Sequence, residues 1–520
     1  MQTQVLIIGA GITGTGLARD LALRGIASIV VDRGDFNSGA SGSNHGLLHS
    51  GARYVAADPE AARECREESA LLKRLAPHCV EDTGGLFVAV QGDEERYIEK
   101  FPRLCSECGI ETEAMGPEKA RELEPALSEA IKAAYFVPDG AVEPFRLSLD
   151  NMAQAMELGA EFWPFAEVQG FEMDGAWISK ARLSKGNDGE TRTVEPRIVV
   201  NAAGAWSGRV AAMAGAPFEM LYSKGTMAVT ASRLAQRVIN RLRHPADGDI
   251  LVPGGHVSIL GTTSVHLPDL DSIAPTVEEV DALVREGSRL LPELESARYI
   301  RAYAGVRPIY SSGGEQSGGE RSAGRGFVLL DHGEEGVGNL LSLTGGKLTT
   351  YRLMAEKCAD RICDRLNVDA ACRTHLEPLP RSEDGALLEH RTADRIAMST
   401  ERADDPLLCE CEMVPRSDLI HVAETTPRQH RNPDLTAFRL RSRMGKGPCQ
   451  GTFCSIRVPG YLFGKGDKSK QAEWIRDFLQ ERWKGLRPVL WGVQLAQAEL
   501  TQGMHCGFFC LEAPWNRGKK

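Results

Sequence analysis

Four cysteines near the C-terminal end of the sequence have the side-chain type and the spacing to hold a metal centre. One residue separates Cys409 from Cys411, and 38 positions later come Cys449 and Cys454, which are separated by four residues. Four thiolates in two close pairs can bind a Zn²⁺ ion or a 2Fe-2S cluster. Zinc sites usually use pairs separated by two residues, and this spacing departs from that pattern. A Zn²⁺ site and unliganded core cysteines are the alternatives.

Three cations lie in segments that are far apart in the sequence. Arg53 belongs to HSGARY, Arg307 to YAGVRP and Lys347 to GGKLTTYR, each beside glycines or an apolar stretch. An isolated buried charge costs several kcal/mol, so cations that converge would need an anionic partner. A phosphate monoester would meet that need through a bidentate arginine and the point charge of a lysine. The alternative is that each cation pairs with a carboxylate of the chain itself.

A glycine-rich turn close to the N-terminus indicates a dinucleotide site. The run GAGITG places Gly9, Gly11 and Gly14 between an apolar run and a helical stretch, and Asp32 ends the next apolar run. The first glycine makes the turn, the second lets the backbone approach a pyrophosphate, the third allows helix and strand to pack closely, and the carboxylate accepts ribose hydroxyls. This pattern predicts a right-handed, parallel βαβ unit and leaves FAD and NAD open.

The remaining patterns predict a mixed α/β body up to about residue 375. We expect helices at 60–75, 141–158 and 471–483, and strands at 86–90, 198–201, 259–261 and 327–330. The polar stretch 376–405 is typical of a linker, and a cysteine-bearing unit (406–462) and a helical tail (463–520) follow it. Residues 311–326 are too poor in apolar side chains to be buried and are expected to form a loop.

The composition excludes several classes of protein. With 61 Lys and Arg against 71 Asp and Glu in 520 residues, the formal charge of -10 gives no reason to expect a nucleic acid as partner. No apolar run reaches the roughly 18 residues that cross a bilayer, and no signal peptide is recognisable, so we expect a cytoplasmic protein. An odd number of cysteines, 13, does not fit a secreted disulfide framework and favours metal or redox roles.

The N-terminal fingerprint, the run GASGSNHG after the second strand and the run VNAAGAWS at 200–207 resemble the FAD-binding oxidoreductases of the D-amino-acid oxidase superfamily. The resemblance implies an α/β fold, with an FAD-binding Rossmann-like domain and a mixed-sheet substrate domain. The residues that it implies for FAD binding, beyond the fingerprint, are Ser41, Ser43, Ala203, Gly204, Gly345, Gly346 and Lys347.

The three cationic segments, together with ILGTTSV at 259–265, are similar to motifs of the FAD-dependent glycerol-3-phosphate dehydrogenases, and the similarity covers the first 375 residues. It implies that Arg53, Tyr54, Arg307 and Lys347 face sn-glycerol 3-phosphate beside the flavin. A hydride would pass from C2 of the substrate to the flavin while a base accepts the hydroxyl proton, and the product would be dihydroxyacetone phosphate.

The identity of the catalytic base stays open in the sequence. His49 is the preferred candidate, because an imidazole titrates near neutral pH and this one lies within four residues of Arg53. A histidine that only packs near the flavin is an equal alternative, and His45 and His266 are weaker candidates. Arg307 could also act in catalysis by stabilising a developing alkoxide.

The cysteine segment looks like the 2Fe-2S domain of bacterioferritin-associated ferredoxins, including the turn at 447–451. The order of flavin body, linker, cluster domain and tail, with ERWKG at 481–485, resembles the anaerobic, multi-subunit glycerol-3-phosphate dehydrogenases over nearly all 520 residues. The resemblance implies partner subunits that accept electrons and pass them to a membrane quinone. It also implies peripheral association with the inner face of the cytoplasmic membrane.

Two further alternatives follow from the same residues. The chain could be a flavin oxidase or a dehydrogenase of another hydroxy compound, with the cysteines forming a zinc-stabilised docking element. The tail carries aromatic residues that could dock a partner, although aromatics at helical spacing more often cover a protein's own core. These residues are Trp483, Trp491, Phe508 and Phe509.

Overall fold

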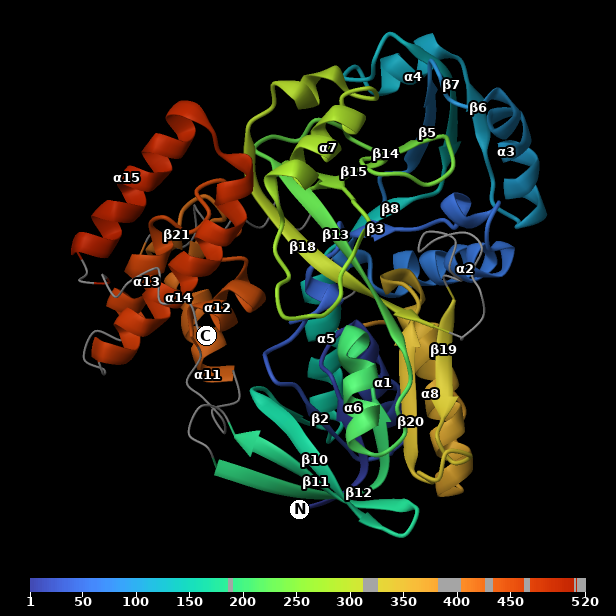
Figure 1. Cartoon of the computed structure of the whole chain (residues 1–520), viewed down its shortest axis with the longest axis vertical. Helices are drawn as coiled ribbons and strands as arrows, with labels where there is room; N and C mark the ends of the chain where they lie inside the picture. Colours follow the sequence, from blue (N-terminus) through green and yellow to red (C-terminus); the bar gives the residue numbers. More distant parts are fainter. Residues whose placement is uncertain are drawn as a thin grey trace.

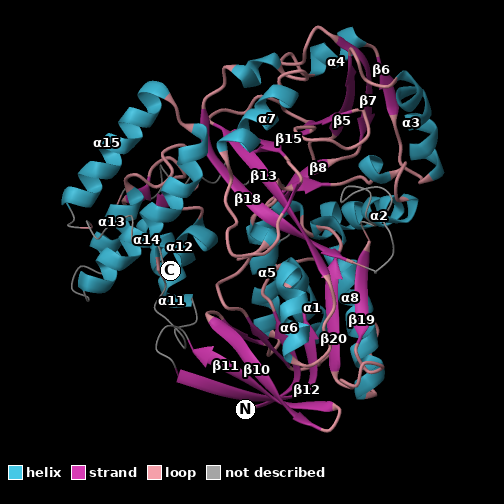
Figure 2. Cartoon of the chain, in the orientation of Figure 1, coloured by secondary structure: helices cyan, strands magenta, loops and turns pink. Residues whose placement is uncertain are grey.

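The computed structural model describes the chain outside a small number of segments. The residues that it leaves undescribed are 186–189, 312–325, 382–403, 426–433, 463–467, 509–510 and 512–520. The expected loop at 311–326 and most of the expected linker therefore fall outside the described residues. Figure 2 shows two sheet-based halves and a mainly helical module at the C-terminal end.

The half of the molecule that holds the N-terminus is built on an eight-stranded sheet (Figure 1). β1 (Gln2–Ile8) lies between β12 (Glu190–Asn201) and β2 (Ser28–Val31) and pairs with both in parallel. The other strands are β9 (Glu161–Trp163), β10 (Ala166–Asp174), β11 (Trp177–Lys185), β19 (Phe327–Asp331) and β20 (Leu340–Gly345). The parallel pairing of β1 with β2 confirms the predicted βαβ unit.

Alternate side chains of β1 face two different layers, because successive residues of a strand point to opposite faces. Val5 and Ile7 pack against a helical layer, whereas Leu6 and Ile8 pack against the β10–β11 hairpin and α6 (Ser207–Met213). The helical layer consists of α1 (Ile12–Leu23), α5 (Pro144–Glu157) and α8 (Tyr351–Leu366). Burial on both faces explains why this strand has a continuous apolar sequence.

The second half is built on a nine-stranded sheet. Its long antiparallel pair, β13 (Met220–Thr230) with β18 (Tyr299–Tyr310), sets Ser223 opposite Arg307 and Gly225 opposite Gly305. The other strands are β5 (Gly85–Val90), β6 (Glu113–Met115), β7 (Ile131–Val137), β14 (Val238–Arg241), β15 (Ile250–Gly254), β16 (Val257–Gly261) and β17 (Val265–His266). α7 (Val277–Gly287) packs against this sheet and buries Leu283 in its core.

Three short strands and three helices complete the two sheet-based halves, which together form the N-terminal body (residues 1–381). They are β3 (Leu47–Leu48), β4 (Val80–Glu81), β8 (Gly140–Val142), α2 (Pro59–Leu75), α3 (Glu95–Glu107) and α4 (Pro117–Leu123). α2 confirms the helix expected at 60–75. The helix expected at 141–158 begins only at Pro144, because β8 pairs with β3 and β4 and holds the preceding residues in extended backbone.

The C-terminal module is a small helical unit with a core of its own (Figure 1). Its elements are β21 (Leu407–Cys409), β22 (Val414–Pro415), α11 (Arg416–Thr425), α12 (Leu435–Ser442), α13 (Cys454–Leu462), α14 (Lys468–Leu486) and α15 (Gly492–Phe508). Phe438 of α12, Phe478 of α14 and Cys506 of α15 share one buried cluster with Cys409 and Cys454. The helices of the tail thus form part of the core that surrounds the cysteines.

Among the described residues, no helix combines the length and the apolar character needed to cross a membrane.

Candidate active site and cysteine centre

The glycines of the fingerprint occupy positions where a side chain would collide with the backbone. Gly9, at the end of β1, has φ +116°, and a Cβ there would lie 2.4 Å from the carbonyl oxygen of Ala202. A Cβ at Gly14 would lie 1.9 Å from the carbonyl oxygen of Gly9, so α1 can pack this closely against the turn only with glycine at this position. A Cβ at Gly11 would lie 3.0 Å from Ser41 Oγ. Each glycine therefore lets strand, turn and helix approach as a dinucleotide site requires.

Asp32 is held at the end of β2 by a set of donors. Its Oδ2 accepts a hydrogen bond from the Ala10 amide at 2.8 Å, and its Oδ1 accepts from the Gly34 amide at 2.8 Å and from Ser38 Oγ at 3.0 Å. Burial raises the pKa of Asp32, and these donors oppose that effect. The carboxylate is thus fixed in orientation before any ribose arrives.

Two cavities join into one channel beside this turn. The first, about 300 Å³, is lined by Gly9, Gly11, Asp32, Ala203 and Gly204. The second, about 320 Å³, shares lining residues with the first. The shared residues are Thr13, Ala40, Ser41, Pro308 and Gly345. A channel of this length suits an elongated cofactor.

One pair in the channel was not anticipated from the sequence. The guanidinium of Arg33 lies 4.1 Å from the ring of Trp206, and both residues line the first cavity. The only feature of the sequence that could have indicated Arg33 is its position directly after Asp32. A stacked arginine and tryptophan form a flat wall against which an aromatic base can lie.

The second cavity collects the cations predicted from three distant segments. Arg53, Arg307 and Lys347 line it together with Tyr54 and His49. The remaining predicted flavin contacts, Ser43 and Gly346, line it too. Lys347 Nζ lies 4.6 Å from the centre of the Tyr54 ring, and Tyr54 Oη lies 3.4 Å from His49 Nε2. Segments hundreds of positions apart thus meet at one cavity that adjoins the dinucleotide site.

Arg53 corrects part of the charge prediction, because it already has an acidic partner. Its Nη2 forms an ion pair with Asp249 Oδ2 at 2.9 Å, and Asp249 is fully buried. Its Nη1 is enclosed without a hydrogen-bond partner in the part of the chain that the structure describes. The alternative of pairing within the chain therefore holds at Arg53.

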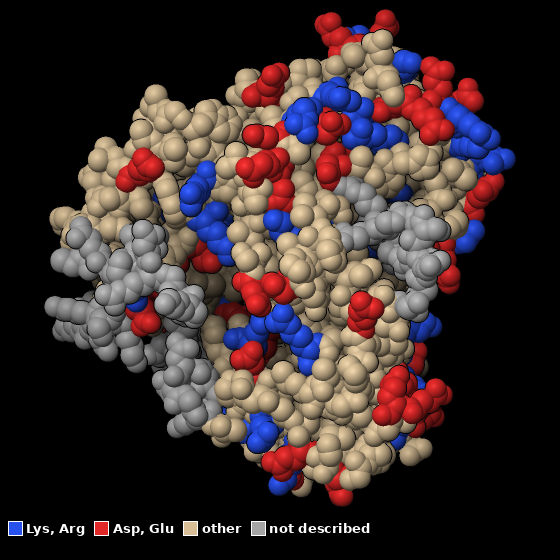
Figure 3. Space-filling model, in the orientation of Figure 1, with Lys and Arg blue, Asp and Glu red and all other residues tan. Residues whose placement is uncertain are grey.

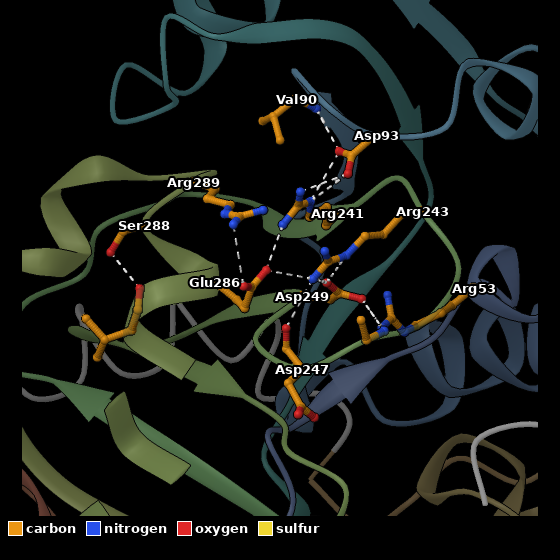
Figure 4. A network of polar contacts seen from close by, with 12 residues as sticks. Arg53, Val90, Asp93, Arg241, Arg243, Asp247, Asp249, Glu286, Ser288 and Arg289 are labelled. Atoms are coloured by element: carbon orange, nitrogen blue, oxygen red, sulfur yellow. Dashed lines mark hydrogen bonds and ion pairs between the residues drawn. The ribbon is translucent and has the colours of Figure 1, made fainter. Parts of the chain in front are cut away.

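The ion pair of Arg53 is the end of a longer chain of alternating charges (Figure 4). Asp249 also pairs with Arg243 at 2.8 Å, and Arg243 pairs with Glu286 at 3.2 Å. Glu286 in turn pairs with Arg241, which also forms a buried pair with Asp93 at 2.8 Å. Arg289 also lies 3.9 Å from Glu286, so Arg53 ends a network of four arginines and three acids in which Asp249 holds its guanidinium in place.

Arg307 is held by uncharged oxygens. Its guanidinium donates to Ser223 Oγ at 3.1 Å, to the carbonyl oxygen of Thr263 at 3.0 Å and to the hydroxyl of Thr262. A Cβ at Gly225 would lie 2.8 Å from Nη2, so this glycine leaves room for the guanidinium on the neighbouring strand. No pattern in the sequence indicated this support, which depends on the register of β13 against β18.

The three candidate histidines differ in where they lie. His45 and His49 line the cavity, whereas His266, on the exposed strand β17, does not. Burial, together with the charges of Arg307 and Arg53, lowers the pKa of His45 to about 3. A base with so low a pKa accepts a proton poorly at neutral pH. His49, next to Tyr54, remains the better placed of the two.

The four predicted cysteines lie together in the C-terminal module. Cys411 Sγ is 3.6 Å from Cys449 Sγ and 4.0 Å from Cys409 Sγ, and Cys409 also hydrogen-bonds Cys454. A Cβ at Gly447 would lie 2.6 Å from Cys411 Sγ, so the loop before Cys449 can approach Cys411 this closely only because residue 447 is glycine.

Backbone amides point at these sulfurs. Gly445 donates to Cys409, and Gly451 and Thr452 donate to Cys449. In the absence of a bound ion, contact with Cys411 and then burial raise the pKa of Cys449. Amide donors of this kind stabilise sulfur that carries negative charge, as in a metal-bound thiolate.

The separation of the sulfurs bears on which metal centre the four cysteines could hold. In a tetrahedral zinc site with bonds of about 2.3 Å, every pair of sulfurs would lie about 3.8 Å apart. Within the described ranges, the groups of three or more ligand atoms that lie within 4.8 Å of one another do not include these cysteines. A 2Fe-2S cluster divides its four ligands between two irons, so a more open arrangement suits it. The residues present can supply the four thiolate ligands of a 2Fe-2S cluster.

The module is fastened to the N-terminal body by charged contacts. Arg441 of α12 forms two hydrogen bonds to Asp35, at 2.6 and 2.7 Å, and both side chains are almost fully buried. Arg443 bridges Glu143 of the N-terminal body and Glu412 of the module. These contacts hold the cysteine loop against the N-terminal body.

A cavity of about 300 Å³ lies between the two sites. Ser43, which also lines the channel, and Tyr303 contribute to its wall from the N-terminal body, and Gln450, the neighbour of Cys449, contributes from the module. Tyr303 donates a hydrogen bond to the carbonyl oxygen of Asn44 at 2.8 Å. The channel and the cysteine loop thus face each other across this one cavity.

The model of one protein family, described as FAD dependent oxidoreductase, matches residues 4–352. The chain belongs to this family. The match covers both sheets and the whole channel, and it confirms the predicted fold class and the prediction of FAD as a cofactor.

Individual relatives agree with this assignment. A component of the anaerobic glycerol-3-phosphate dehydrogenase of Escherichia coli (strain K12) is 42% identical, over 98% of this chain and 97% of the relative. The corresponding component from Haloferax volcanii is 40% identical, over 96% and 89%. Both relatives are named as one subunit of that enzyme. These matches include the cysteine module and confirm the predicted membership of the FAD-dependent glycerol-3-phosphate dehydrogenases.

A solved structure shows the same fold. The glycerol-3-phosphate dehydrogenase of Bacillus halodurans, complexed with FAD, superposes with a TM-score of 0.67, at 21% identity, over 94% of this chain and 96% of that chain.

Proposed function

We propose that this chain oxidises sn-glycerol 3-phosphate to dihydroxyacetone phosphate with FAD in the channel, and passes the electrons through a 2Fe-2S cluster to partner subunits. The observation that carries the proposal is the meeting of Arg307, Lys347 and Arg53 at one cavity continuous with the dinucleotide site. The activity named for relatives that match nearly the whole chain supports it.

The dinucleotide end of the channel would hold FAD through groups that are already in place. The amides at the start of α1 would face the pyrophosphate, because a helix N-terminus favours negative charge, and Asp32 would accept ribose hydroxyls. The turn at Gly345 and Gly346 would approach the flavin end, where both lie with φ between +70° and +80°. Bound FAD supplies an acceptor for two electrons from the substrate.

The phosphate of the substrate would be held by the three cations together. Arg307 offers a planar fork and Lys347 a point charge, which together match a dianion. Arg53 forms an ion pair with Asp249, so it would orient the phosphate by hydrogen bonding more than add net positive charge to the cavity. Tyr54 lies under Lys347 and offers a hydroxyl donor at the same wall.

Proton transfer would fall to His49. The hydroxyl proton would pass to His49 and the hydrogen on C2 would leave as a hydride, for which bound FAD supplies the acceptor, so that the C2–O bond would become a carbonyl. Arg307 would lower the barrier further by stabilising charge on that oxygen. The low pKa of His45 argues against that histidine as the base.

The cysteine module would carry electrons away from the flavin one at a time. Cys409, Cys411, Cys449 and Cys454 would hold the 2Fe-2S cluster, and the ion pairs at Asp35 and Glu143 would keep it close to the channel. From there the electrons would reach partner subunits and, through them, a quinone at the inner face of the cytoplasmic membrane. The relatives' names, which describe each as one subunit of a larger enzyme, support such partners.

The exposed aromatic side chains of the tail favour a role in binding a partner over a role in covering the core of the module. Trp491 is 57% exposed and Phe508 is 83% exposed, so neither covers the core of the described module. Trp483 is partly buried, and Phe509 lies outside the described residues. Figure 3 shows few charged side chains over the part of the surface where α15 lies.

Analysis of the protein purified without oxygen tests the proposal. We expect about one FAD, two irons and two acid-labile sulfides per chain, and reduction of a dye when sn-glycerol 3-phosphate is added. Zinc in place of iron would overturn the cluster, and formation of peroxide without dye reduction would make the chain an oxidase.

A further inference from the structure

Arg482 of α14 is a cation anchored beside the cysteine loop. Its Nη2 donates to Thr452 Oγ1 at 3.0 Å, and its Nη1 reaches Gln502 Oε1 of α15 at 3.5 Å. Thr452 donates its own hydroxyl to the carbonyl oxygen of Cys449 at 2.7 Å. The guanidinium is therefore tied to the residue that follows a predicted cluster ligand by three positions.

No acid of the described chain balances this charge. In the described part of the molecule, Arg482 forms no ion pair with a carboxylate, and Glu481, next to it, pairs with Lys484 at 3.6 Å. The Nε of Arg482 is enclosed and has no hydrogen-bond partner among the described residues.

A partly buried cation without an anion is costly, and four neutral thiols do not relieve the cost. A 2Fe-2S cluster does. Two ferric ions, two sulfides and four thiolates sum to a dianion, and the gain of one electron makes it a trianion. The electron comes from the reduced flavin of the proposed function, and no bond is formed or broken at Arg482. A fixed cation stabilises the trianion more than the dianion.

We propose that Arg482 is the counter-cation of the cysteine centre and raises the reduction potential of the 2Fe-2S cluster held there. This inference rests on the proposed function, which supplies the cluster. Arg482 acts as a positioning and tuning residue, since it touches the loop of Cys449 and Thr452 and not the substrate. Gln502 fixes its orientation from α15.

A potentiometric titration of the full chain, purified without oxygen and followed by the electron paramagnetic resonance of the reduced cluster, tests the proposal. We expect Arg482→Gln to weaken one-electron reduction about tenfold, which lowers the midpoint potential by about 59 mV. Arg482→Lys should restore most of the potential. Lys484→Gln removes an exposed charge from the same helix and should leave the potential unchanged.

The other possible results of this titration also test the proposal. A wild-type potential in Arg482→Gln with a full complement of iron would overturn the proposal. If Arg482→Gln fails to hold iron, Arg482→Lys decides: retained iron supports a role for the charge, and lost iron overturns it in favour of a role for the shape of the side chain. Zinc in the wild-type protein would overturn the proposed electron route and, with it, any redox role of Arg482. Loss of substrate oxidation with an intact cluster would affect the proposed function alone.

Discussion

Arg53 in the proposed substrate cavity and Arg482 beside the cysteine centre differ in whether a carboxylate of the described chain pairs with them. In the cavity, Arg53 ends a network of four arginines and three acids and is paired with Asp249 before any ligand binds. In the cysteine centre, Arg482 has no carboxylate partner among the described residues. Under the proposed function, the protein itself preorganises Arg53 in the first site, whereas the second site would reach electrostatic balance only with its proposed cofactor.

Loss of the cluster should be the largest effect. Cys449→Ser removes a proposed ligand whose sulfur contacts that of Cys411, so we expect little or no bound iron and a lower thermal midpoint for the module. Flavin content and flavin reduction by substrate should persist. Cys372→Ser, a change at a cysteine distant in sequence from the module, is the control. Full iron content in Cys449→Ser would remove Cys449 from the ligand set.

Removal of Arg307 should have the largest effect in the substrate cavity. Arg307→Ala takes away a cation that uncharged oxygens hold in place, and we expect a loss of about 3 kcal/mol or more in kcat/KM, roughly a hundredfold or greater. Steady-state assays with sn-glycerol 3-phosphate measure it. An unchanged kcat/KM would exclude Arg307 from the site.

Separation of the two regions should have an intermediate effect. Arg441→Ala breaks the buried pair with Asp35, which weakens docking of the module by about 3 kcal/mol. We expect slower reduction of the cluster after mixing with substrate, at an unchanged rate of flavin reduction. Arg416→Ala, at an exposed position of the same module, is the matched control. The charge swap Asp35→Arg with Arg441→Asp should recover the rate, and a failure of Arg441→Ala to slow it would contradict the role of this contact.

The pairing of Arg53 predicts a smaller loss than that at Arg307. Arg53→Ala leaves Asp249 paired with Arg243, so we expect a decrease in kcat/KM of about 1 kcal/mol, close to fivefold. A loss as large as that of Arg307→Ala would show that the two cations contribute equally and would contradict the difference drawn from their partners.

The smallest expected effect concerns pH. The folded chain keeps His45 neutral down to a pKa of about 3, whereas an unfolded histidine binds a proton below about 6.5. The unfolded state therefore binds more protons, and His45 lowers stability as the pH falls from about 6.5 towards 3. His45→Gln should reduce the drop in thermal midpoint between pH 7 and pH 5. An identical drop in both proteins would contradict the pKa assigned to His45.

Local patterns predicted the dinucleotide end well, because each of its parts lies within one short stretch. Gly9, Gly14 and Asp32 each meet the physical requirement that their position in a βαβ unit imposes. The partner of Arg53 could not be predicted in this way, since Asp249 lies 196 positions away and only the folded chain brings the two together. Helix starts were also less certain, as the late start of α5 at Pro144 shows.

The support that Arg307 receives from the neighbouring strand could not be predicted from the sequence either. The space that Gly225 leaves for Arg307 depends on the pairing of β13 with β18, and no short motif encodes that register. Arg482 lies in ERWKG, a run that stood out only through a resemblance. Its role emerges from the packing of α14 against the loop of Thr452.

The central claim is that the cavity grips the phosphate of its substrate beside FAD and sends the electrons to the cysteine centre. Mixing the oxygen-free protein with one equivalent of sn-glycerol 3-phosphate, and in parallel with glycerol, tests it in a single turnover. We predict that the phosphate ester bleaches the flavin and then produces the resonance of a reduced 2Fe-2S cluster, while glycerol does neither. Equal bleaching by glycerol, or bleaching with no reduced cluster, would contradict the claim.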